Sequence, residues 1–283
     1  MMVDKGSKRK KYIFLAVWLA LIVLLLAGIL LLWSPAEKHE SIKEVMLDGV
    51  LHEYNKVSLF GLEVNPAVIS AYTVTAILLL AAALIRIFAV PKFRLIPTKF
   101  QSVIEKLVEF FMDMAHDHSS HRPKFVGAYI FGAGVYICFS TIFELFGLQV
   151  LTTNGQSIAL PAPISDINAA IAMGVMSYLV ILGAGFICRG IKGGLGVLKD
   201  FSLPISMSFR LFGALLSGLL VTELVYYYVN LSFVLPVIVG ILFTLLHAVI
   251  QTYVLTTLVS IFYGEAVEPK PKKQKKENKK HEK

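Results

Sequence analysis

Charged residues are scarce in this chain of 283 residues, where Asp, Glu, Lys and Arg make up only 16%. Soluble domains carry roughly 25% charged residues. Hydrophobic residues reach 56%, and several long stretches carry no charge at all. This composition excludes an ordinary water-soluble globule and indicates a core that is built in lipid.

Cysteine is nearly absent, and Cys138 and Cys188 lie in apolar segments without the spacing of a metal site. His116, His118 and His121 stand close together only at the polar end of an amphipathic segment, so we expect no metal there. The glycine-rich run 190–196 lacks the Lys-Ser/Thr ending of a phosphate loop and is expected to form a flexible turn. We find no dinucleotide fingerprint, nucleophile triad or internal repeat, and predict no cofactor.

Six apolar segments are long enough to cross a bilayer, which takes about 20 residues as a helix. They cover 12–33, 67–90, 125–151, 167–188, 201–229 and 233–263. We therefore predict an all-α integral membrane protein, with an N-terminal anchor and a core of five helices. Ser34-Pro35-Ala36 after the first segment resembles a signal-peptide cleavage site, but the apolar run exceeds the usual 7–15 residues, which favours an uncleaved anchor.

The basic residues predict the orientation of these segments, because cytoplasmic loops are enriched in Lys and Arg. Of the 27 Lys and Arg, 23 fall in four segments that alternate with the spans, namely 1–11, 86–124, 189–200 and 264–283. We predict that both termini are cytoplasmic. The predicted regions are a basic N-terminus and anchor (1–33), an extracytoplasmic segment (34–66), a membrane domain (67–268) and a Lys-rich tail (269–283). The basic tails favour contact with anionic lipid rather than nucleic acid.

An amphipathic helix is predicted between the second and third spans. Thr98 and Gln101 fit a capping box at its start. Apolar residues then recur at helical spacing through Phe100, Leu107 and Phe111. Such a helix can lie on the inner membrane surface or pack against its own bundle, and both arrangements remain open.

Ionisable residues within a bilayer are costly, so each is a functional candidate. Arg210 is the strongest, because an arginine stays charged at physiological pH. A strip of small or polar residues surrounds it on one predicted helical face, which would let another helix approach closely. The strip consists of Ser206, Gly213, Ala214, Ser217 and Gly218. The alternative is an arginine that is paired to a carboxylate inside a static bundle.

A second polar stripe is predicted in the last span, where Gly240, Thr244, His247 and Gln251 share one face. His247 is either a proton relay, given its near-neutral titration, or a satisfied structural residue. Three acids fall toward the predicted outer ends of their spans, which suggests a cation-attracting funnel. They are Glu144, Asp166 and Glu223. Each has a structural alternative: Asp166 as a helix N-cap, Glu223 as a partner of His247, and Glu144 as a protonated hydrogen-bonding group.

Four motifs in order resemble subunit a of F-type ATP synthases. Pro204-Ile-Ser-Met-Ser-Phe-Arg210-Leu-Phe-Gly213 is similar to that family's Arg-Leu-Phe-Gly-Asn signature. Gln251-Thr-Tyr-Val-Leu, Leu95-Ile-Pro-Thr-Lys-Phe-Gln101 and Asp166-Ile-Asn168 resemble its final helix, its inner-surface helix and the opening of a span. At four positions the chain departs from the family pattern. The family commonly carries Asn or an ionisable residue at each of them, and this chain carries a different residue. These are Glu144, Ala214, Leu219 and Thr244.

The resemblance implies a static ion-channel subunit that is not an enzyme on its own. Its last two helices would be long, tilted and packed against a ring of c subunits in a bacterial cell membrane. Arg210 would separate an outer half-channel from an inner one, and H+ or Na+ would pass through both. The candidates for the outer path are Glu223, His247, Glu144 and Asp166. The candidates for the inner path are Ser202, Ser206 and Gln251.

The resemblance also implies partners: the c-ring, the stalk b subunits, which would contact the helix at 98–118, and the remaining ATP synthase subunits. Two other classes of protein compete with this hypothesis. A secondary transporter could use Arg210 to bind an anionic substrate, although such folds usually contain inverted repeats. A purely structural scaffold would instead hold Arg210 in a saturated ion pair.

Overall fold

A computed structural model describes residues 16–20, 23, 57–59, 62–119, 123–151, 157–227 and 235–268. The chain divides into two compact units, residues 1–41 and 42–283. In the first unit, residues 16–20 are helical, and most of the predicted anchor lies outside the described residues. The Lys-rich tail lies outside them as well.

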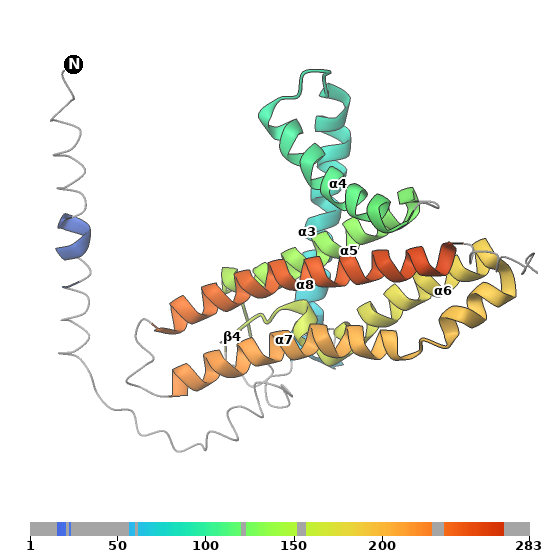
Figure 1. Cartoon of the computed structure of the whole chain (residues 1–283). Coiled ribbons are helices and arrows are strands. Elements are labelled where there is room, and N and C mark those ends of the chain that lie inside the picture. The colour runs from blue at the N-terminus through green and yellow to red at the C-terminus, as the bar shows by residue number, and fades with distance from the viewer. Residues whose placement is uncertain are drawn as a thin grey trace, which may run out of the picture. The chain divides into compact units, whose positions relative to one another are not determined.

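Within the second unit, the described residues form six long helices, shown in Figure 1. They are α3 (Pro66–Leu84), α4 (Lys99–His118), α5 (Pro123–Phe143), α6 (Ile167–Leu198), α7 (Ser202–Tyr227) and α8 (Leu235–Val267). Helix α4 corresponds to the predicted amphipathic surface helix. Short helical turns follow α3 and α5 and precede α6. These are η1 (Ile85–Ala89), η2 (Val90–Lys92), η3 (Glu144–Phe146) and η4 (Pro163–Ser165).

Two small antiparallel hairpins are found among the described residues, one before α3 and one between α5 and α6. The first pairs β1 (Val57–Leu59) with β2 (Leu62–Val64), and the second pairs β3 (Gln149–Leu151) with β4 (Ser157–Ala159). The third predicted span, 125–151, was therefore too long at its end. The helix gives way at Gly147, whose φ of 58° is left-handed and favours glycine.

Within the described residues, four helices are long and apolar enough to cross a membrane, by length and composition. They cover Pro66–Lys92, Pro123–Phe146, Ile167–Leu198 and Val237–Val267, which confirms helices at four of the six predicted spans. Helix α7, at the fifth, has 26 residues. At about 1.5 Å of rise per residue it is also long enough for a bilayer core of about 30 Å.

Helix α6 is two helical segments joined by a sharp turn. Gly190 has φ 61° and ψ −157°, a backbone conformation that only glycine adopts readily. After this turn the chain folds back on the first segment of α6. Two contacts show this: Tyr178 Oη donates a 3.3 Å hydrogen bond to the Val197 carbonyl, and Gly193 packs against the backbone of Gly185. The predicted turn is therefore confirmed at Gly190, but the residues after it are helical.

Helices α5 and α8 run antiparallel. The rings of Phe125 and Tyr263 lie 6.3 Å apart at one end. Further along, Thr252 Oγ1 donates a 3.4 Å hydrogen bond to the Gly134 carbonyl. This register brings the end of α5 and the following turn η3 level with the first half of α8, against which η3 packs.

The surface helix α4 begins and ends in different surroundings. Thr98 Oγ1 accepts a hydrogen bond from the Gln101 backbone N–H, as predicted, but the Gln101 side chain bonds to the Arg94 backbone and to Glu105 instead of returning to Thr98. Phe100 is exposed near the start, whereas Phe111 is buried in the bundle. The first half therefore leaves apolar side chains outside the bundle, and the second half packs against it.

Candidate functional site

Arg210 lies on a face of α7 that the described chain leaves open. Ser206, Gly213 and Ser217 are exposed with it, and a Cβ added at Gly213 would meet no atom within 4 Å. Ala214 and Gly218 flank this face and are half-buried. The predicted strip of small residues is therefore present, and we call Arg210, Ser206, Gly213 and Ser217 the open face of α7.

The opposite face of α7 is packed against the bundle. Met207, Leu211 and Leu215 are buried in the main core cluster. Ser208 Oγ donates to the Pro204 carbonyl, and this stretch lies so close to Gly174 of α6 that an added Cβ would stand 3.0 Å from the Ser208 backbone nitrogen. Close packing on one side fixes the direction in which Arg210 points.

Gln251 of α8 holds the backbone beside Arg210. Its Nε2 donates a 3.3 Å hydrogen bond to the Arg210 carbonyl oxygen, and the Gln251 side chain is buried. This contact places Gln251 of the second polar stripe against the backbone of α7 at Arg210, while the Arg210 side chain lies on the open face. In Figure 1 the two helices run alongside each other, and α6 leads into α7 at one end.

His247 lies about one helical turn from Gln251 and also faces α7. Its ring atoms Cε1 and Nδ1 would stand 3.3 Å from a Cβ added at Gly218, and its ring centroid is 5.8 Å from that of Phe243. Gly218 therefore leaves the room that the imidazole occupies. The structure places His247 and Gln251 on the same interhelical seam.

The remaining candidates are spread over three helix ends. Glu144 is exposed in η3, directly after α5. Glu223 belongs to α7, but its side chain lies outside the described part of the structure. Ser202 is exposed in the first turn of α7. The structure therefore brings Arg210, Gln251 and His247 together. Glu144 lies in the turn η3, which packs against the first half of α8, and Ser202 lies about two helical turns before Arg210.

Asp166 caps a helix, as one of its two interpretations predicted. Its Oδ1 accepts a 2.7 Å hydrogen bond from the Asn168 backbone N–H, and its Oδ2 accepts one of 3.1 Å from Asn65 Nδ2. Asn65 is itself the N-cap of α3, where its Oδ1 accepts from the Ala67 N–H at 2.9 Å. The two caps join the starts of α3 and α6.

Asn65 is a residue that the sequence interpretation missed. The signal was present, because Asn followed by Pro66 is a typical helix start. Its link to Asp166 spans 101 positions in the chain, and no local pattern predicts such a pairing.

No static partner for Arg210 is found among the side chains that the structure describes. A buried or lipid-facing arginine without a partner costs roughly 2.5–3.5 kcal/mol or more at mid-membrane. The described residues also contain no group of three or more His, Cys, Asp or Glu that could hold a metal ion. The open face of α7 therefore has a charge that calls for a partner from outside this part of the chain.

These features define a multi-pass helical membrane protein that presents an arginine on a face of small residues. The family model described as ATP synthase A chain matches residues 69–264, and the chain belongs to this family. A curated relative is ATP synthase subunit a of Cereibacter sphaeroides (strain ATCC 17025 / ATH 2.4.3). It is 25% identical over an alignment of 204 positions, and the alignment covers 68% of this chain and 78% of the relative.

The family places this chain in the membrane sector of ATP synthase, with a role in ATP synthesis and ion transport. This confirms the resemblance drawn from the four motifs. It does not favour the alternative of a secondary transporter.

Proposed function

We propose that this protein is the static ion-channel subunit of a rotary ATP synthase, and that the open face of α7 packs against a ring of c subunits. The carrying observation is that Arg210 is exposed, beside open space at Gly213, on a helix whose other face is packed. A partner helix can approach closely along such a strip. An approaching carboxylate would supply a counter-charge to Arg210.

The fixed charge of Arg210 would then do two things. A ring carboxylate must be neutral, by a proton or a bound cation, to face lipid. Next to a guanidinium its charged form is favoured, so the carboxylate releases its proton or cation there. The same positive charge repels a cation that tries to pass directly from one half-channel to the other. One electrostatic effect thus drives release and prevents leakage.

Two polar paths are proposed to lead to this point. We assign Glu223, His247 and Glu144 to the outer half-channel, with Asp166 near its mouth. This rests on the location of His247 on the seam with α7 and on the register that brings η3 level with α8.

We assign Ser202, Ser206 and Gln251 to the inner half-channel. Ser202 and Ser206 are exposed on α7, and Gln251 bonds to the backbone at Arg210.

The proposed orientation and partners follow from charge and exposure. The ends of α3 and α8 and the turn at Gly190 carry the basic segments, so we assign them to the cytoplasmic side of a bacterial cell membrane. The exposed first half of α4 would contact the stalk b subunits. The subunit itself would not catalyse ATP hydrolysis or synthesis.

ATP-driven ion pumping in inverted membrane vesicles tests the proposal. We expect Arg210→Ala to abolish pumping while the complex still assembles. Arg210→Lys should also impair pumping, because it keeps the charge but loses the planar fork. The matched control is Arg86→Ala, which removes another exposed arginine at a helix end and should leave pumping intact. Normal pumping by assembled Arg210→Ala would overturn the proposal.

A further inference from the structure

A recess of about 280 Å³ lies at the end of α8, between the turn of α6 and the start of α7. It is separate from the open face of α7, and neither half-channel assignment uses it. One part of its wall is apolar and includes Ile181, Leu203 and Phe262. The rest carries four charged side chains: Arg189, Lys192, Asp200 and Glu265.

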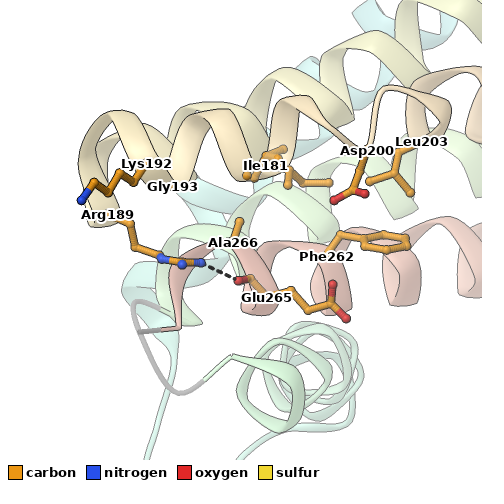
Figure 2. Close-up of a pocket in the computed structure, with 11 residues that line it drawn as sticks. Ile181, Arg189, Lys192, Gly193, Asp200, Leu203, Phe262, Glu265 and Ala266 are labelled. Carbon is orange, nitrogen blue, oxygen red and sulfur yellow. Dashed lines mark hydrogen bonds between the residues drawn. The ribbon is translucent and has the colours of Figure 1, made fainter. Parts of the chain in front are cut away.

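The four charges are separated by sign. Figure 2 shows Arg189 and Lys192 at one end of the recess, and the carboxylates of Asp200 and Glu265 toward the other. Within the described part of the chain, none of the four forms an ion pair. Arg189 Nη1 donates a 3.3 Å hydrogen bond to the Glu265 carbonyl oxygen, which uses the backbone of that residue and leaves its carboxylate free.

This arrangement selects the charge of a ligand. A simple anion would meet Arg189 and Lys192 favourably but would be repelled by the two carboxylates, and a simple cation has the reverse problem. A molecule with a phosphate at one end and an ammonium group at the other satisfies both sets. We propose that the recess binds the phosphoethanolamine headgroup of a membrane phospholipid.

The position of the recess supports a lipid rather than a free metabolite. It is lined by the last residues of α8 and by the turn region of α6, which are the ends of two candidate spans. Helix ends of this kind meet the headgroup layer. The apolar wall would meet the glycerol and first acyl carbons, while the charged residues meet the headgroup.

The size of the recess agrees with this assignment. Pockets for drug-sized ligands have volumes of roughly 300–1,000 Å³. At about 280 Å³, the recess suits a headgroup and leaves the acyl chains in the bilayer. The guanidinium of Arg189 already donates to the Glu265 carbonyl, so it would be positioned to donate a further hydrogen bond to a phosphate oxygen without a large loss of side-chain entropy.

A competition experiment on the purified, delipidated ATP synthase complex tests this proposal. The complex is equilibrated with equal amounts of isotope-labelled phosphatidylethanolamine, phosphatidylglycerol and phosphatidylcholine, and the retained lipids are quantified by mass spectrometry. A photoactivatable phosphatidylethanolamine then maps the contact on this subunit. We expect at least about fivefold preference for phosphatidylethanolamine, from one additional charged hydrogen bond, and crosslinks to the recess.

Charge variants make the test specific. The double variant Asp200→Asn with Glu265→Gln removes the partners of the ammonium, so the preference over phosphatidylglycerol should disappear while binding of phosphate-bearing lipid persists. The double variant Arg189→Gln with Lys192→Gln should reduce retention of all three lipids at this site. Lys92→Gln, an exposed charge in η2, is the control and should change nothing.

Three results would overturn the proposal. They are retention without headgroup preference, crosslinks elsewhere on the subunit, or displacement of the lipid by millimolar inorganic phosphate, which would show a phosphate site only. Changed ion pumping in the Asp200→Asn and Glu265→Gln variant with no loss of lipid preference would instead indicate an aqueous ion vestibule. Lipid retention is measured without ion flow, so its failure is distinct from a failure of the proposed channel function.

Discussion

Replacement of Asp166 separates its role as a helix cap from a role in ion transport. Asp166→Ala removes the acceptor for the Asn168 N–H and the link to Asn65. Loss of an N-cap costs about 0.5–2 kcal/mol, and a hydrogen bond to a charged group contributes about 1.5–3 kcal/mol. Because both side chains are half-exposed, the lower part of these ranges applies, and we expect a loss of about 2–3 kcal/mol.

Asp166→Asn provides the comparison, because Asn is as good an N-cap as Asp. The assay is the temperature at which the purified complex loses this subunit, measured beside ATP-driven pumping. For a unit of this size, we expect Asp166→Ala to lower that temperature by about 5–10 °C. Asp166→Asn should lower it by much less and should retain pumping. If Asp166→Asn is as stable as the unmodified protein but does not pump, the carboxylate carries ions and this reasoning is refuted.

Three glycine substitutions test the packing. Gly264→Ala would place a Cβ against the His118 carbonyl oxygen, so we expect α4 to separate from α8 at a cost of about 1–3 kcal/mol. The assay is heat-induced loss of the subunit from the complex. Gly132→Ala is the control, because a Cβ added there would meet no atom within 4 Å. Gly213→Leu should leave subunit insertion intact but reduce co-purification of the c-ring, unlike Gly132→Leu; equal c-ring yields would show that no partner covers this face. Gly190→Ala should cost about 1–2 kcal/mol because of its positive φ, and an unchanged melting temperature would contradict the turn.

Hydrophobic runs predicted most of the membrane helices, because a span must be apolar along its whole length whatever it packs against. The boundaries were less predictable. The apolar pattern predicts a span at 167–188 followed by a flexible turn, whereas helix α6 continues to Leu198 after the break at Gly190. The residues after Gly190 include several glycines, and a glycine-rich sequence looks the same to a local pattern whether it forms a helix or a loop.

The candidate site also has one part that the sequence predicts and one part that it does not. Arg210 and its strip of small residues could be predicted, since a charge within a span is rare and costly. The seam that joins Gln251 to the Arg210 carbonyl depends on how α7 and α8 rotate against each other, and sequence spacing gives only the face of each helix. The Asn65–Asp166 link and the recess at Asp200 required three-dimensional proximity between distant segments.

Under the proposed function, the contrast between the two faces of α7 would let one helix serve a moving partner. Disrupting a close-packed contact between helices costs several kcal/mol of stability. The face that carries Met207, Leu211 and Leu215 therefore keeps the backbone of Arg210 in place. The open face carries small side chains, which present few interdigitating groups that would lock a neighbouring helix. In the proposed function, a partner helix would therefore be drawn to the charge at each passage and would still move on, whereas a face of large apolar side chains would hold it by packing.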